Sequence, residues 1–259
     1  MGVLDRFSLE GQVAVITGAG RGIGEAIATG LAEAGANVVL AARRTNEIEA
    51  VAAKIEKIGV KALPVTTDVM EPEQVQRLAE TAFSTFGKLT CWVSNAGGAD
   101  DRVARTLLQM PERQWDFQLN LNLKAVWTGA QAAATIMKEQ GGGTIINISS
   151  AVAGRASPFN GPYAVAKSGV DNLTQTLSSE LARYNIRVNG VSPGPIPTEG
   201  FKEFLNITDD DVPEMGKKLR IPLGRLGTPE DISPAVVFLA SDASAWMTGE
   251  TIVIKGGHA

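Results

Sequence analysis

Short apolar runs alternate with longer segments of helical periodicity along most of the chain. The apolar runs are typical of buried strands, whereas the longer segments place apolar residues three or four positions apart, as one face of a helix requires. The expected strands cover residues 13–17, 37–42, 62–65, 89–94, 144–149, 186–191 and 251–254. The expected helices cover residues 22–34, 47–58, 72–86, 111–139, 163–184 and 229–240, with one bend or break in the fourth.

Strands that are apolar on both faces and alternate with helices predict a parallel sheet with helices covering both sides. We therefore expect a single α/β domain over residues 1–259, built on a doubly wound, Rossmann-like parallel sheet of about seven strands. The segment 193–228 departs from the alternation, because it contains five prolines and the acidic run 209–211. A long irregular insert in such a fold usually serves as an active-site lid. We predict a substrate lid here, with a surface loop of no function as the alternative.

The composition excludes several classes of protein but does not indicate a particular function. The 259 residues are 44% hydrophobic and 20% charged, with a net charge of −4, which excludes a disordered chain and argues against nucleic acid as a partner. Cys91 is the single cysteine, so no intrachain disulfide can form. His258 is the only histidine, which argues against a His-rich metal site. Because the start lacks a secretory signal pattern and no apolar run approaches about 18 residues, we expect a cytoplasmic protein that binds no membrane.

Residues 17–24, Thr-Gly-Ala-Gly-Arg-Gly-Ile-Gly, join the first strand to the first helix. Gly18, Gly22 and Gly24 let the backbone turn sharply and approach a pyrophosphate, while the N–H groups at the helix start face the anion. The spacing differs from the G-x-G-x-x-G fingerprint, so the position between strand and helix carries the argument. We predict a dinucleotide site here, with a helix start that binds nothing as the alternative.

The end of the second strand indicates which dinucleotide to expect. A carboxylate there would hydrogen-bond the adenosine ribose and repel a 2′-phosphate. The strand ends instead in Arg43 and Arg44, and Arg21 lies in the glycine turn. Because guanidinium groups pair well with phosphate, we predict NADP(H) rather than NAD(H) as the cofactor. Solvated surface arginines are the alternative.

A tyrosine and a lysine lie four positions apart at the start of the fifth expected helix. Tyr163 and Lys167 are therefore about 40° apart on one helix face. A lysine beside a tyrosine stabilises the phenolate and lowers a phenol pKa that starts near 10. The pair favours general acid–base chemistry, although a simple surface pair has the same spacing.

With these motifs in order, the chain resembles the short-chain dehydrogenase/reductase family in its compact form, over residues 9–257. The conjunction of motifs is far more specific than any one of them. The Asn95-Ala-Gly-Gly98 turn and residues 224–227 are similar to bacterial hydroxysteroid and 3-oxoacyl reductases. The matching motifs are residues 17–24, Asp68-Val69, Asn95-Ala96-Gly97, Asn122, Ser149-Ser150, Tyr163 with Lys167, and Pro193-Gly194 with Thr198.

The resemblance implies four catalytic residues. Tyr163 would be the general acid in ketone reduction and the base in alcohol oxidation. Lys167 would lower the pKa of Tyr163 and bond the nicotinamide ribose, and Ser150 rather than Ser149 would bond the substrate carbonyl. Asn122, preferred over Asn120, would anchor a water relay that leads from Lys167 to solvent.

The resemblance also implies the cofactor contacts. Asp68 and Val69 would flank the adenine, and Asn95, Ala96 and Gly97 would lie near a cofactor ribose. Contacts to the nicotinamide carboxamide would come from Pro193, Gly194, Ile196 and Thr198. Contacts to the phosphates would come from Gly18, Arg21, Gly22, Ile23, Gly24, Arg43 and Arg44.

Apolar residues near the expected pocket indicate the substrate class, and the family resemblance indicates the assembly. The pocket walls are expected from residues 152–159, 99–106 and the lid, where Phe159, Phe201, Phe204 and Leu205 offer apolar surface. We expect a ketone with an apolar, cyclic or steroid-like body. A 3-oxoacyl-thioester reductase, a non-catalytic NADP(H)-binding regulator, and an epimerase or dehydratase are the alternatives. By resemblance, the two long helices would pack against symmetry mates in a homotetramer.

Overall fold

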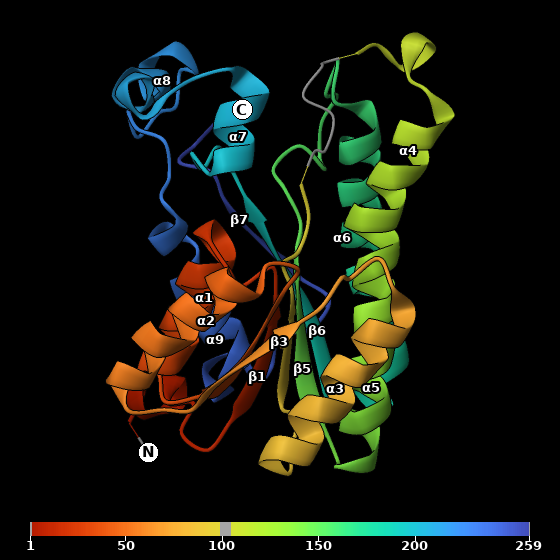
Figure 1. Cartoon of the computed structure of the whole chain (residues 1–259), viewed down its shortest axis with the longest axis vertical. Helices are drawn as coiled ribbons and strands as arrows, with labels where there is room; N and C mark the ends of the chain where they lie inside the picture. Colours follow the sequence, from red (N-terminus) through yellow and green to blue (C-terminus); the bar gives the residue numbers. More distant parts are fainter. Residues whose placement is uncertain (1, 99–104, 259) are drawn as a thin grey trace.

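The structure, a computed structural model, describes residues 2–98 and 105–258 and contains a seven-stranded parallel sheet (Figure 1). The order across the sheet is β3-β2-β1-β4-β5-β6-β7, and every neighbouring pair is parallel. The strands are β1 Val13–Thr17, β2 Asn37–Ala42, β3 Ala62–Thr66, β4 Cys91–Ser94, β5 Gly143–Ile148, β6 Ile186–Pro193 and β7 Thr251–Ile254. The predicted doubly wound α/β domain is therefore confirmed.

Helices cover both faces of the sheet. One layer contains α1, α2 and α9, and the opposite layer contains α3, α5 and α6 (Figure 1). The helices are α1 Gly22–Glu33, α2 Thr45–Ile55, α3 Pro72–Phe86, α4 Glu112–Leu119, α5 Ala125–Glu139, α6 Gly161–Leu181, α7 Glu199–Leu205, α8 Val212–Lys218 and α9 Ser233–Ala240. Over the part of the chain that the structure describes, none of them is long and apolar enough to cross a membrane.

The strand β1 illustrates why the central strands are apolar without interruption. Its five residues are all buried. Ala14 and Ile16 pack into the hydrophobic cluster on the α1 side, whereas Val13 and Val15 pack into the cluster on the α3 and α5 side. Because successive side chains of a strand point to opposite faces, a strand covered on both sides needs apolar residues at every position.

Three expected elements differ in detail from those observed. The long helix 111–139 is interrupted by a π-helical turn, Asn120–Lys124, which locates the predicted break. The expected helix 229–240 begins as a separate 3₁₀ turn, Pro229–Asp231, ahead of α9. The insert 193–228 is less irregular than expected, because it contains α7 and α8.

The sheet order determines where a ligand can bind. Connections from β1 run to one side of the sheet through β2 and β3, and to the other side from β4 onward. In open α/β sheets the crevice at the carboxyl ends of the strands on either side of such a reversal is the usual binding site. The glycine turn follows β1 and the Asn95-Ala96-Gly97 turn follows β4, so both lie at this crevice.

Candidate active site

The glycine turn packs tightly against the turn that follows β4. Gly18 has a φ of +67°, and a Cβ atom on it would lie 2.9 Å from the Cα of Ala96. A Cβ on Gly24 would lie 2.1 Å from the carbonyl oxygen of Gly18. These positions therefore require glycine, because a side chain at either one would collide with the protein's own backbone.

Asn95 links the ends of β1 and β4. Its Nδ2 donates to the carbonyl oxygens of Thr17 at 2.9 Å and Gly18 at 3.2 Å. The backbone N–H groups of Asn95 and Ala96 donate in turn to the Thr17 hydroxyl, at 3.0 and 3.1 Å. Asn95 therefore shapes the glycine turn through its side chain, which adds a structural role to the ribose contact that was expected.

The start of α1 fits an anionic group. Arg21 is the N-cap residue, with an extended backbone, and its side chain makes no capping hydrogen bond. The first N–H groups of a helix need such partners, and a phosphate supplies them. The glycine contacts and the uncapped start of α1 together fit a dinucleotide pyrophosphate at this turn.

The three predicted phosphate ligands differ in their surroundings. Arg43 is exposed at the end of β2. Arg44 donates from Nε to Glu47 at 2.7 Å, and Arg21 forms an ion pair with Glu199. Glu47 and Glu199 were missed in the sequence. The spacing of three from Arg44 could have indicated Glu47, but no local spacing points to Glu199.

Glu47 also contacts the glycine turn. A Cβ on Gly20 would lie 2.9 Å from Oε2 of Glu47. Glu47 therefore links Arg44 to the glycine turn at Gly20, the residue before Arg21. The end of β2 and the glycine turn, here called the charged corner, carry Arg43, Arg44 and Arg21; Glu47 is paired with Arg44, and Glu199 with Arg21.

The residues expected at the adenine lie directly after β3. Asp68 accepts a hydrogen bond at Oδ1 from the backbone of Met70 at 3.0 Å, and its own N–H donates to Gln74 at 2.9 Å. Val69 packs against the hydrophobic cluster on the α3 side. Both backbone groups of Asp68 and its Oδ1 are thus used within the local turn, which leaves its Oδ2 and Val69 as the groups suited to an adenine.

Tyr163 and Lys167 lie together in the first two turns of α6. The Nζ of Lys167 is 5.7 Å from the centroid of the Tyr163 ring and donates to the carbonyl oxygen of Ile148 at 2.8 Å. Lys167 is only 3% exposed. Ser150, just beyond β5, shares a hydrogen bond with the Tyr163 side chain. The structure therefore brings the predicted serine, tyrosine and lysine to one corner.

The pKa of Tyr163 corrects one expectation. Burial raises the pKa of the Tyr163 phenol above its ordinary value, and the hydrogen bond from Ser150 lowers it by less. The net lowering expected from Lys167 is therefore wrong for this structure, because the desolvation of the phenolate outweighs its partners. Burial also lowers the pKa of Lys167 to about 8, and the negative charge of Asp171 opposes that shift.

Asn122 is held inside the π-helical turn. Its side chain is fully buried, and its Oδ1 accepts from the backbone N–H of Gly98 at 2.9 Å. Its Nδ2 donates to the carbonyl of Gly98 at 3.1 Å and to the Oε1 of Gln118 at 2.9 Å. π-Helical turns inside α-helices are frequent at functional sites. Gln118, one helical turn earlier, is a supporting residue that the sequence analysis missed.

Gly97 connects Asn122 with Lys167. A Cβ on Gly97 would lie 2.8 Å from Oδ1 of Asn122 and 3.4 Å from Nζ of Lys167. The two side chains therefore approach the same backbone position from α6 and from the π-helical turn. This proximity is compatible with the relay from Lys167 that the family resemblance implies.

The residues after β6 divide between the core and the crevice. Gly194 packs against Lys255, because a Cβ would lie 2.6 Å from its Cα, and Ile196 is 5% exposed in the core cluster. Only the backbone of Ile196 is thus left for a cofactor. Thr198 caps α7 and lies across the crevice, with its methyl group 3.3 Å from where a Cβ of Gly22 would be.

Three of the four expected apolar pocket residues, Phe201, Phe204 and Leu205, belong to the insert 193–228 itself. Phe201 and Leu205 pack against the buried cluster of Met215, Ile221 and Leu226 within the insert. Phe159, by contrast, is 54% exposed and has a φ of +66°. Residues 99–104 of the expected pocket wall lie outside the described residues. Phe159 therefore remains as exposed apolar surface in the segment between β5 and α6.

Comparisons of the sequence and of the structure with known proteins indicate the same family. Residues 18–259 match the family model described as enoyl-(acyl carrier protein) reductase. The chain is 36% identical to the 3-oxoacyl-(acyl-carrier-protein) reductase of Thermotoga maritima, over 96% of this chain and 98% of that protein.

Two solved structures are similar over almost their whole length. A 7α-hydroxysteroid dehydrogenase complexed with NADH and 7-oxo glycochenodeoxycholic acid superposes with a TM-score of 0.92 at 34% identity, covering 100% of this chain and 98% of that one. A gluconate 5-dehydrogenase from Burkholderia cenocepacia, in complex with NADP and tartrate, superposes with a TM-score of 0.90 at 36% identity, covering 99% and 98%. The chain belongs to the short-chain dehydrogenase/reductase family, whose members are oxidoreductases that act on carbonyl and alcohol groups with a nicotinamide cofactor.

Proposed function

We propose that the protein is an NADP(H)-dependent carbonyl reductase, reversible as an alcohol dehydrogenase, for a ketone with an apolar body. The observation that carries the proposal is the convergence of Ser150, Tyr163 and Lys167 beside the crevice that fits a dinucleotide. The nicotinamide ring would supply the hydride. The protein would supply orientation and a proton.

In the reducing direction, each residue has a distinct task. The Tyr163 hydroxyl donates its proton to the carbonyl oxygen, and the Ser150 hydroxyl donates a hydrogen bond to the same oxygen. The burial of Tyr163 supports the reducing direction, because the raised pKa keeps the phenol protonated until the substrate carbonyl oxygen becomes negatively charged. The ammonium group of Lys167, near the phenol ring, then stabilises the phenolate that remains.

Arginines at the charged corner favour NADP(H). Arg43 and Arg44 follow β2, where the family places a carboxylate when NAD(H) is bound. Related structures contain either NADH or NADP, so the local residues carry this preference. Replacing Arg43 by Ala is expected to weaken NADPH binding and to leave NADH binding nearly unchanged. An unchanged affinity for NADPH would contradict the assignment.

Two substrate classes are candidates, a cyclic or steroid-like ketone and a 3-oxoacyl thioester. The exposed ring of Phe159 and the similarity to the hydroxysteroid dehydrogenase support a cyclic or steroid-like ketone. A 3-oxoacyl-thioester reductase is the second candidate, favoured by the Thermotoga relative. A panel of steroid, cyclic, aromatic and 3-oxoacyl-thioester ketones, followed by loss of NADPH absorbance, separates the two. Tyr163→Phe is the control, and NADPH binding without turnover of any panel member would instead indicate a regulator.

We further propose that helices α5 and α6 assemble the protein into a homotetramer. Trp127 on α5 is 44% exposed and lines a groove with Ala130, Leu177 and Leu181. Exposed apolar patches of this kind commonly contact other protein surfaces. Light scattering after gel filtration should give four times the mass of one chain, and Trp127→Lys should reduce it. A monomer at assay concentrations would contradict the assembly. Location in the cytoplasm stays a prediction.

A further inference from the structure

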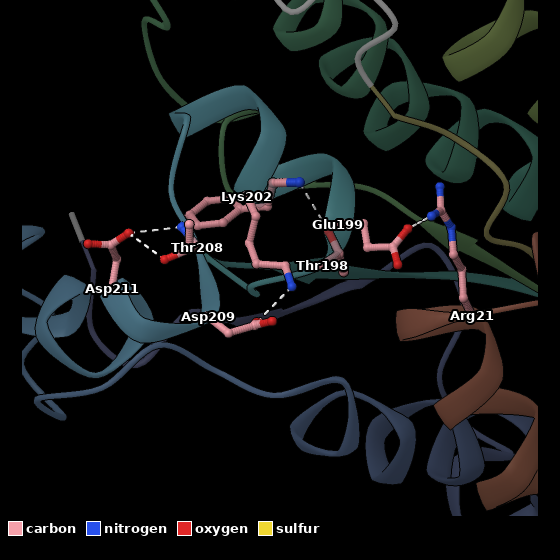
Figure 2. A network of polar contacts seen from close by, with 8 residues as sticks. Arg21, Thr198, Glu199, Lys202, Thr208, Asp209 and Asp211 are labelled. Carbon is pink, nitrogen blue, oxygen red and sulfur yellow. Dashed lines mark hydrogen bonds and ion pairs between the residues drawn. The ribbon is translucent and has the colours of Figure 1, made fainter.

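The lid, residues 193–228, has polar contacts of its own. Lys202 on α7 forms an ion pair with Asp209 at 2.7 Å (Figure 2). The backbone N–H and the hydroxyl of Thr208 both contact Oδ2 of Asp211, at 2.9 and 3.0 Å (Figure 2). Together with the apolar cluster described above, these contacts tie α7 to α8, so that the lid can move as one body.

One ion pair joins this body to the glycine turn. Figure 2 shows Glu199, the first residue of α7, reaching across to Arg21 at the start of α1. The two side chains are 59% and 48% exposed, so water and ions can compete for either partner. Beside them, the methyl group of Thr198 lies 3.3 Å from where a Cβ of Gly22 would be. The Arg21–Glu199 pair therefore spans the crevice in which the dinucleotide fits.

Arg21 also belongs to the charged corner at the end of β2. Its neighbour Gly20 contacts Glu47, which holds Arg44. A 2′-phosphate placed among these arginines would be a second anion for Arg21, besides Glu199. Because the guanidinium has a limited set of donors, a closer contact to one anion weakens its contact with the other.

We propose that Glu199 is a specificity-determining residue that competes with the 2′-phosphate of NADP(H) for Arg21. NAD(H), which has no 2′-phosphate, leaves the Arg21–Glu199 pair intact, whereas NADP(H) releases α7 from the glycine turn. The inference rests on the proposed cofactor and adds a role for the lid. Linkage makes the effect reciprocal, because the factor by which the ion pair weakens NADP(H) binding is also the factor by which bound NADP(H) weakens the ion pair.

Dissociation constants for NADPH and NADH test the competition. Glu199→Gln is expected to tighten NADPH binding about two- to fivefold, the size of an exposed ion pair, and to leave NADH binding unchanged. The gain should vanish at high salt and in an Arg21→Met background. Glu214→Gln is the matched control, because it removes an exposed lid carboxylate whose ion pair with Lys217 lies within α8.

Two results would overturn the proposal. An equal change for NADPH and NADH would show that Glu199 acts on the part that the two cofactors share. A gain that persists in the Arg21→Met background would show that Arg21 is not the shared partner. Arg43→Ala, measured in parallel, tests the cofactor assignment independently, since its effect on NADPH does not depend on Glu199.

Hydrogen exchange gives a readout of the lid. NADPH is expected to speed amide exchange in Glu199–Leu205 of the wild-type protein relative to NADH. In Glu199→Gln the two cofactors should give the same exchange. Slower exchange in wild-type α7 with NADPH than with NADH would contradict release of the lid.

Discussion

The proposed catalytic corner, formed by the end of β5, the π-helical turn and the start of α6, differs in construction from the proposed lid, residues 193–228. In the catalytic corner, Asn122 and Lys167 are buried and bonded to main-chain atoms. In the lid, the ion pair of Lys217 with Glu214 is exposed at both ends, with side chains that are 74% and 61% exposed. A buried polar group that loses its partner costs about 1–3 kcal/mol, whereas an exposed ion pair contributes about 0–1 kcal/mol. The catalytic corner is therefore expected to be rigid, whereas the contacts of the lid are weak enough to break and re-form.

The largest effect is expected at the centre of the catalytic corner. Tyr163→Phe keeps the ring and removes the proton donor, so turnover should fall by about 10²–10⁴-fold. Steady-state rates with NADPH and the best ketone of the panel measure the loss. NADPH affinity should stay near that of the wild type. A variant that keeps more than a tenth of the wild-type rate would contradict the acid role.

Asn122 tests whether the corner depends on buried polar contacts. Asn122→Ala leaves the N–H and C=O groups of Gly98 and the side chain of Gln118 without this partner. We expect a loss of about 1–3 kcal/mol in the free energy of unfolding, with a lower turnover rate. Urea denaturation checks the first and steady-state kinetics the second.

Asn120 provides the matched control, because it is exposed at the start of the same π-helical turn. Asn120→Ala should change the free energy of unfolding by less than about 0.5 kcal/mol. Equal losses in the two variants would show that burial of Asn122 is not what matters.

Asp171 allows the electrostatics of the corner to be shifted. Its negative charge raises the pKa of Lys167, which burial has lowered to about 8. Asp171→Asn should therefore lower the pKa of Lys167 further, so that the ammonium group loses its proton at lower pH. The alkaline limb of the kcat/KM profile should move toward lower pH, with little change at pH 6. A shift toward higher pH would contradict the sign of this coupling.

The smallest effect is expected in the lid. Lys202→Met removes the ion pair with Asp209. The free energy of unfolding should fall by about 0.2–1 kcal/mol, because the carboxylate end of the pair is exposed to solvent. Urea denaturation measures this change. A loss above about 2 kcal/mol would show that the lid is as tightly constructed as the catalytic corner, and would remove the contrast.

The two regions also differ in how far the sequence predicts them. Helical spacing is local, so Tyr163 and Lys167 could be placed on one face of a helix from their positions. The π-helical turn was expected only as a bend or break, because the bond between Asn122 and Gly98 that accompanies it joins distant segments. In the lid, no helical or strand periodicity indicates the cluster that buries Met215, so the sequence predicts an irregular insert.

Electrostatic direction was the hardest property to predict. A lysine one helical turn from a tyrosine indicates a lowered phenol pKa, but the depth of burial decides the net sign. That depth depends on packing across the crevice, which no local pattern contains. Likewise, Arg21 and Glu199 lie far apart in sequence, and only the path of the chain after β6 brings them together.

Hydride transfer itself is the most direct test of the account. NADPH that carries deuterium on the transferred position of C4 can be incubated with the best ketone of the panel, and the product alcohol analysed by mass spectrometry. One deuterium on the carbinol carbon is expected with the wild-type enzyme, and almost no product with Tyr163→Phe. Deuterium-free product from either stereospecifically labelled form of NADPH, or equal labelled product from the variant, would contradict it.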